Sequence, residues 1–78
     1  MSHVPHELAE EFPQHAQRMH DLKQNDGHFA RLFDDYHRVN RAVHRAETDI
    51  EPMEDVALVD LRKQRAALKD AVYRIVTA

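Results

Sequence analysis

The fold of this chain is decided by residues 28–50, whose sequence is HFARLFDDYHRVNRAVHRAETDI. Apolar residues recur in this stretch at alternating spacings of three and four, which places them along one side of an α-helix. Such a narrow apolar stripe is stable when it lies against another helix. The stripe consists of Phe29, Leu32, Tyr36, Val39, Val43, Ala46 and Ile50.

A second stripe follows in residues 54–76 and supplies the partner helix. Its members are Leu58, Leu61, Leu68, Val72 and Ile75, with Arg65 at the one position where an apolar residue is missing. Pro52 cannot continue the first helix and suits the first turn of the next, so we expect long helices over 28–49 and 54–76. Because the connection is short, the two helices run antiparallel. The sequence therefore predicts an all-α, coiled-coil-like helical hairpin.

The two stripes also predict a register for the hairpin. Matching them outward from the loop places Val39 opposite Arg65, Tyr36 opposite Leu68, and Leu32 opposite Val72. A charge inside the seam destabilises the fold unless its donors find acceptors, so we expect the Arg65 guanidinium to turn outward. Its candidate acceptors are the Tyr36 hydroxyl, Asn40 and an acidic neighbour. Such a polar layer penalises slipped registers, so Arg65→Leu is expected to raise thermal stability and to loosen the choice of register or oligomer.

One or two short helices are expected before the hairpin. Residues 1–12 form either a mobile terminus or a short helix, and Pro13 ends it because the residue before a proline leaves the helical region. A further helix is predicted over 14–24, and Asn25 or Asp26 can cap the long helix that follows. We expect this short helix to pack against the open end of the hairpin.

Four residues are expected to join the short helix to the hairpin. Met19 and Leu22 lie on one side of the helix predicted over 14–24, and Phe29 and Phe33 widen the apolar stripe at the open end of the hairpin. We therefore expect Met19 and Leu22 to pack on Phe29 and Phe33.

Length and composition limit the chain to a single small helical domain, 1–78. A chain of this size buries only about 60% of its unfolded surface, so a lone hairpin is marginal without a partner. The sequence contains no cysteine, no stretch with the pattern of a signal peptide and no run near the roughly 20 apolar residues of a membrane span. We therefore expect a cytoplasmic protein that does not bind membranes.

The helix predicted over 54–76 carries more apolar surface than one partner helix covers. Beside its seam stands an outer stripe that consists of Val59, Ala66, Tyr73 and Val76. A face this broad contacts two neighbours, and the N-terminal segment reaches only the open end of the hairpin. We therefore expect a second copy of the chain to cover the outer stripe, most simply in a two-fold dimer.

The segments FPQHAQRMHDLKQNDGHFARLFDDYHRVNRAVHRAE and DLRKQRAALKD resemble the YdcH-like family, small bacterial proteins with a domain of unknown function. The resemblance covers about residues 8–76. It rests on Phe12-Pro13, Leu22-Lys23, Asn25, His28-Phe29, Leu32-Phe33, Tyr36-His37, Glu47, Leu61, Lys63 and Leu68-Lys69-Asp70 in this order and spacing. The resemblance implies a helical hairpin and brings no activity, catalytic residue or cofactor. Ala66 stands where such proteins more often have leucine, which implies looser packing of the outer stripe.

The sequence offers no pattern of metal ligands or catalytic groups. None of its seven histidines is separated from another by the one-turn spacing i, i+4, so we expect solvent-exposed histidines and no metal. The adjacent carboxyl groups of Asp34-Asp35 and Glu54-Asp55 point about 100° apart on a helix and cannot share a substrate. We therefore expect no cofactor and no enzymatic activity.

Two functions of different classes remain open. The first is a non-enzymatic protein–protein interaction or scaffold module that self-associates and binds an unidentified protein partner. The second is a nucleic-acid-binding accessory protein. Its basic strip would consist of Arg38, Arg41, Arg45, Arg62, Lys63, Lys69 and Arg74, interrupted by Asp34, Asp35, Asp60 and Asp70. The formal net charge of −3 and these acidic residues favour the first function over the second.

Overall fold

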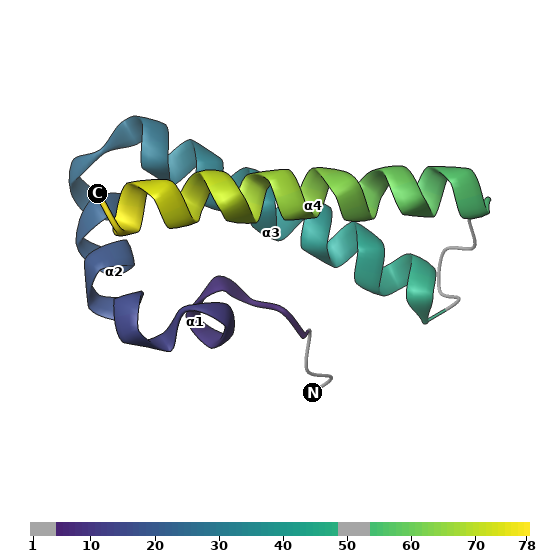
Figure 1. Cartoon of the computed structure of the whole chain (residues 1–78), viewed down its shortest axis with the longest axis horizontal. Coiled ribbons are helices and arrows are strands. Elements are labelled where there is room, and N and C mark those ends of the chain that lie inside the picture. Colours follow the sequence, from purple (N-terminus) through teal and green to yellow (C-terminus); the bar gives the residue numbers. More distant parts are fainter. Residues whose placement is uncertain (1–4, 49–53) are drawn as a thin grey trace.

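The computed structural model describes residues 5–48 and 54–78 and has two long helices with short helices at one end (Figure 1). The elements in chain order are α1 (Leu8–Glu11), the 3₁₀ turn η1 (Pro13–His15), α2 (Ala16–Asn25), α3 (Gly27–Glu47) and α4 (Asp55–Val76). The prediction of an all-α chain with short N-terminal helices is confirmed. Two predictions fall on residues outside the described part of the chain: Ile50 as the end of the first stripe, and Pro52 in the first turn of the next helix.

Asp26 fixes the start of α3. Its carboxylate oxygen Oδ1 accepts hydrogen bonds from the backbone N–H groups of His28, over 3.0 Å, and Phe29, over 3.2 Å. These bonds satisfy two of the N–H groups that the first turn of a helix leaves without partners. The sequence allowed Asn25 or Asp26 as the cap. The structure uses Asp26, while the Asn25 amide donates to the carbonyl of Asp21 within α2.

Two hydrogen bonds between side chains show how α3 and α4 lie against each other. Arg62 Nη2 donates to Glu47 Oε2 over 2.7 Å, and Arg65 Nη1 donates to Asn40 Oδ1 over 3.1 Å. A later residue of α4 thus meets an earlier residue of α3, so the two helices are antiparallel. The second bond lies one position away from the predicted pairing of Val39 with Arg65.

The core lies at the end of the hairpin where α2 meets α3 and where α4 ends (Figure 1). Its buried residues are Leu8, Phe12, Met19, Phe29, Tyr36, Val72 and Val76, and Leu22, Leu32, Phe33, Leu68 and Ile75 pack against them. Met19 and Leu22 therefore share one cluster with Phe29 and Phe33, as the sequence predicted. The Lys23 ammonium group also lies 4.2 Å from the centre of the Phe33 ring, which adds a cation–π contact.

The seam is buried more completely on α3 than on α4. On α3, Phe29, Tyr36, Val39, Val43 and Ala46 are buried and Leu32 is half-buried. Among the seam residues of α4, Val72 is buried, while Leu58, Leu61, Arg65, Leu68 and Ile75 are half-buried. Residues near the N-terminus add to the coverage of α3, whereas much of α4 has α3 as its one described neighbour. The helix with the broader apolar surface is therefore also the less covered one.

Candidate interaction surface

Residues 5–12, the N-terminal segment, are anchored to α3 by two hydrogen bonds. The Tyr36 hydroxyl donates to the backbone carbonyl of His6 over 2.6 Å, and the Asn40 amide nitrogen donates to that of Pro5 over 2.9 Å. Both side chains are fully buried, at 0% and 1% exposure. Burial raises the pKa of Tyr36 to about 12, because it disfavours the charged phenolate. His6 itself has a φ of 65°, a left-handed conformation that a residue with a Cβ rarely adopts without such support.

Asn40 joins three parts of the molecule. Its Nδ2 donates to Pro5 while its Oδ1 accepts from Arg65, so both ends of this buried amide are satisfied. Of the acceptors expected for the Arg65 guanidinium, the structure therefore shows Asn40. The structure reverses the expectation for Arg65→Leu, however. Without Arg65, the buried Asn40 oxygen loses its donor, and an unsatisfied buried acceptor costs about 1–3 kcal/mol.

Two carboxylates of the N-terminal segment make charged contacts. Glu7 lies against Nδ1 of His37, and Glu11 Oε1 lies 2.9 Å from His6 Nδ1 and 3.3 Å from Lys69 Nζ on α4. The hydrogen bond with His6 holds the pKa of Glu11 below its usual value. Burial lowers the pKa of His37, and this effect outweighs the opposing influence of Glu7. The expectation that the histidines are solvent-exposed is wrong for His37, whose side chain is 13% exposed.

The described part of the N-terminal segment takes the short-helix alternative that the sequence allowed for residues 1–12. Leu8 is fully buried and Phe12 is 8% exposed, and both lie in the core beside Val76. Their spacing of four places them on one side of a helical turn, which is the sequence signal that identifies this contact. Residues 1–4 lie outside the described part of the chain.

The outer face of α4 is a row of residues that the hairpin leaves exposed. It consists of Val56, Val59, Lys63, Ala66, Asp70 and Tyr73, which recur at spacings of three and four. Val56 is 81% exposed, Val59 45% and Tyr73 48%. Large apolar side chains with this exposure, aligned on one side of a helix, are typical of a surface that binds another protein.

Val76 does not belong to this face, so the prediction that a second copy covers it is wrong. It is 3% exposed and packs in the core with Leu8 and Phe12 of the same chain. Val76 follows the seam residue Val72 by four positions, which places it about 40° around the helix from that buried residue. The N-terminal segment also reaches Tyr73, whose ring lies 5.4 Å from that of Phe12 between centres, yet half of Tyr73 remains exposed.

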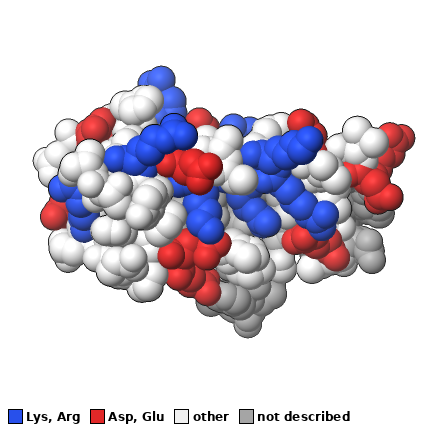
Figure 2. Space-filling model, viewed as in Figure 1, with Lys and Arg blue, Asp and Glu red and all other residues white. Residues whose placement is uncertain are grey.

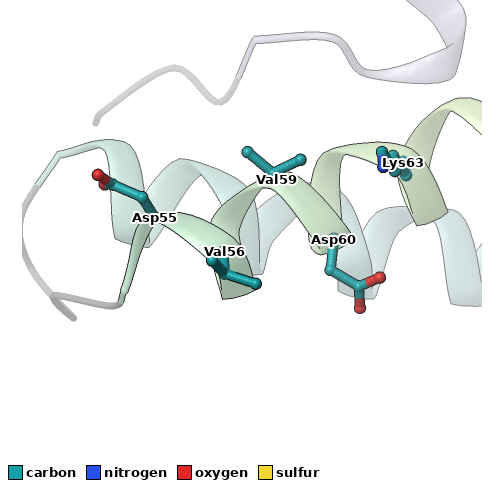
Figure 3. A pocket seen from close by; sticks show the side chains of 5 residues that line it. All are labelled: Asp55, Val56, Val59, Asp60 and Lys63. Carbon is teal, nitrogen blue, oxygen red and sulfur yellow. The ribbon is translucent and has the colours of Figure 1, made fainter.

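A hollow of about 310 Å³ lies at the start of the outer face (Figure 3). It is lined by Asp55, Val56, Val59, Asp60 and Lys63. Val56 was not among the residues predicted for this row, although its position three residues before Val59 continues the same spacing. All five residues come from α4, so the hollow is open to solvent and is unlike the enclosed pocket that a small-molecule site needs. Its two valines and charged rim suit a protruding side chain of another protein.

The charges on this side of the molecule are mixed. Figure 2 shows Lys and Arg side chains interrupted by Asp and Glu across the face that it presents. Arg62 and Lys69 of the suggested basic strip each contact an acceptor on another part of the chain. Lys63 and Asp70, in contrast, have no hydrogen-bond or ion-pair partner among the described residues. Two unpaired charges of opposite sign therefore stand within the outer face.

Two further properties concern residues 5–48 and 54–78 alone. No group of three or more histidine, aspartate or glutamate side chains in these ranges lies close enough together to hold a metal ion. None of the helices in this part of the chain has the length and apolar character needed to cross a bilayer.

The two long helices match a known protein family. The family described as "Protein of unknown function (DUF465)" matches residues 29–76, which cover nearly all of α3 and the whole of α4. The chain belongs to this family. YdcH belongs to it as well, so the resemblance noted in the sequence is confirmed, although the matched range begins after the short N-terminal helices. No curated protein and no solved structure matches the chain.

Proposed function

We propose that this DUF465 member is a non-enzymatic interaction or scaffold module that self-associates through the outer face of α4. The observation that carries this proposal is the exposed row of Val56, Val59 and Tyr73 on one side of a long helix. Covering such a row removes apolar surface from water, and each fully buried valine contributes about 1.5–3 kcal/mol.

Nucleic-acid binding has less support. A nucleic-acid interface needs Lys and Arg side chains that are free to meet phosphates. Here Arg62 is paired with Glu47 and Lys69 with Glu11, so both would have to release an acidic partner first. The acidic residues between them would also repel a polyanion.

Sedimentation equilibrium tests the proposed self-association. We expect the wild-type chain to have the mass of a dimer at roughly 50 µM, where an assembly of micromolar affinity is largely formed. Val59→Glu places a charge in the middle of the apolar row and should give a monomer. Ala57→Glu is the matched control, because it adds the same charge at an exposed position of α4 outside the outer face and should remain a dimer. A wild-type monomer at this concentration would overturn the proposal.

A further inference from the structure

We infer that two copies of the chain pair their α4 helices antiparallel about a two-fold axis beside Ala66, with Tyr73 of each copy in the hollow of the other. This inference rests on the proposed self-association and specifies its geometry. Three features of the outer face support the same axis: the shape of the hollow, the positions of two unpaired charges and the small residue between them.

The hollow has the form of a socket for one side chain of a neighbouring helix. Val56, Val59, Asp60 and Lys63 stand at positions i, i+3, i+4 and i+7 of α4, which are the four residues that form a hole in knobs-into-holes packing (Figure 3). Tyr73 is the largest side chain on the outer face and is half-exposed at the other end of the row. The face therefore carries one knob and one socket.

A two-fold axis at Ala66 brings the knob of each copy to the socket of the other. Tyr73 lies seven positions after Ala66, and the centre of the socket, between Val59 and Asp60, lies six to seven positions before it. An antiparallel two-fold axis exchanges equal distances before and after the point through which it passes. The match is within one position, or about 1.5 Å along the helix. The phenol oxygen of Tyr73 would then reach the polar rim at Asp60 of the second copy.

The same axis pairs the two free charges. Lys63 lies three positions before Ala66, and Asp70 lies four positions after it. Lys63 of each copy therefore faces Asp70 of the other, which gives two symmetric ion pairs at the centre of the interface. Neither side chain has a partner among the described residues of its own chain, so neither needs to break an internal contact to form the pair. The outer face is complementary to itself in charge.

Ala66 permits the close approach that this pairing requires. Its methyl group is the smallest side chain on the outer face, and small residues at a crossing point let two helices come near each other. A leucine at this position would hold the helices apart at the axis and withdraw Tyr73 from the socket. The alanine, which leaves the row less hydrophobic at its centre, thus fits the antiparallel pair.

A parallel pairing of the same face is disfavoured. It would place Lys63 beside Lys63 and Asp70 beside Asp70 of the second copy, so that both ion pairs become like-charge contacts. It would also bring the two Tyr73 side chains together at one end and leave the socket of each copy without a knob. Only the antiparallel arrangement both fills each socket with a knob and pairs opposite charges.

Disulfide crosslinking tests the geometry without background, because the chain contains no cysteine. We expect Ala66→Cys to form a disulfide between copies under mild oxidation with diamide, because the two introduced thiols meet at the axis. A mixture of Lys63→Cys and Asp70→Cys should give the mixed disulfide, while neither variant crosslinks with itself. Gln64→Cys is the control for random collision, since Gln64 is exposed outside the outer face and should stay uncrosslinked.

Charge reversal tests the same pairing in solution. Lys63→Asp and Asp70→Lys each turn two attractive contacts into repulsive ones and should weaken the dimer on the order of tenfold. The doubly reversed chain, with both substitutions, should regain the wild-type dissociation constant. An equimolar mixture of the two single variants should form a heterodimer, because each then supplies the charge that the other lacks.

The outcomes separate this inference from the proposed function. A wild-type chain that sediments as a monomer overturns both. The antiparallel geometry alone is overturned, and self-association stands, if the chain dimerises and Val59→Glu dissociates it, but Ala66→Cys forms no disulfide and Lys63→Asp has no effect. Self-crosslinking of Lys63→Cys would identify a parallel pair and would also overturn the inference.

Discussion

Replacing Tyr36 with phenylalanine would test the anchoring of the N-terminal segment. The Tyr36 side chain is fully buried, and its hydroxyl donates to the His6 carbonyl over 2.6 Å. Phenylalanine keeps the ring and its packing but leaves that carbonyl without its donor. A lost hydrogen bond of this kind costs about 1–2 kcal/mol. We therefore expect Tyr36→Phe to lower the free energy of unfolding by this amount at pH 7.

Alkaline pH provides a second way to measure the contribution of Tyr36 to stability. The pKa of Tyr36 is about 12 in the folded chain, whereas an unperturbed tyrosine has a pKa of 10.0. Because the folded pKa is the higher one, the stabilising contribution is fully present below pH 10 and is lost as the pH rises towards 12. This linkage amounts to about 1 kcal/mol at pH 11 and approaches about 3 kcal/mol above pH 12.

Urea unfolding followed by circular dichroism at pH 7, 9 and 11 measures both effects. The protein concentration must be held constant, because the proposed self-association would make stability depend on it. Between pH 9 and 11, the wild-type chain should lose about 1 kcal/mol more than Tyr36→Phe. If the wild type and Tyr36→Phe lose stability in parallel, the hydroxyl is not buried against His6 and the described anchoring is incorrect.

Three further predictions concern stability. Leu8→Ala should lower the free energy of unfolding by about 2–5 kcal/mol in chemical denaturation, because Leu8 is fully buried, and a loss below 1 kcal/mol would contradict its place in the core. The pKa of His37 is lowered in the folded chain. Its contribution to the free energy of unfolding is therefore present above pH 6.5 and is lost on acidification. Stability should fall between pH 8 and pH 5.5, and His37→Gln should reduce this fall; an unchanged slope would exclude His37 as its source. Arg65→Leu should lower the free energy of unfolding by about 1–3 kcal/mol, and a double-mutant cycle with Asn40→Ala should show positive coupling. A higher melting temperature for Arg65→Leu would show instead that Arg65 acts only on the register.

Much of the hairpin was accessible from local patterns in the sequence. The alternation of three and four between Phe29 and Ala46 specifies a helix with one apolar side, and a short connection makes the next helix antiparallel. The polar position Arg65 was matched to within one residue of Asn40, its partner in the structure. These features depend on residues close together in the chain, where helical geometry converts spacing directly into position.

The exposed row on α4 was predicted in part for the same reason. Val59, Ala66 and Tyr73 follow a heptad and remain exposed, whereas Val76 was assigned to the row and is buried. An ideal helix drifts by about 20° in each heptad, so a row extended by position number moves gradually around the helix. Periodicity alone does not show which end of such a row turns towards a neighbouring segment.

The position of the N-terminal segment was decided by the tertiary structure. Its two anchoring hydrogen bonds join residues that are 30 and 35 positions apart, and its link to Lys69 spans 58 positions. No spacing rule encodes contacts over such separations, because they form only after the hairpin has created a surface with Tyr36, Asn40 and Lys69 on it. The sequence by itself determined two amphipathic helices and their antiparallel packing. Tertiary contacts determined which apolar side chains of α4 that packing buries and which it leaves exposed.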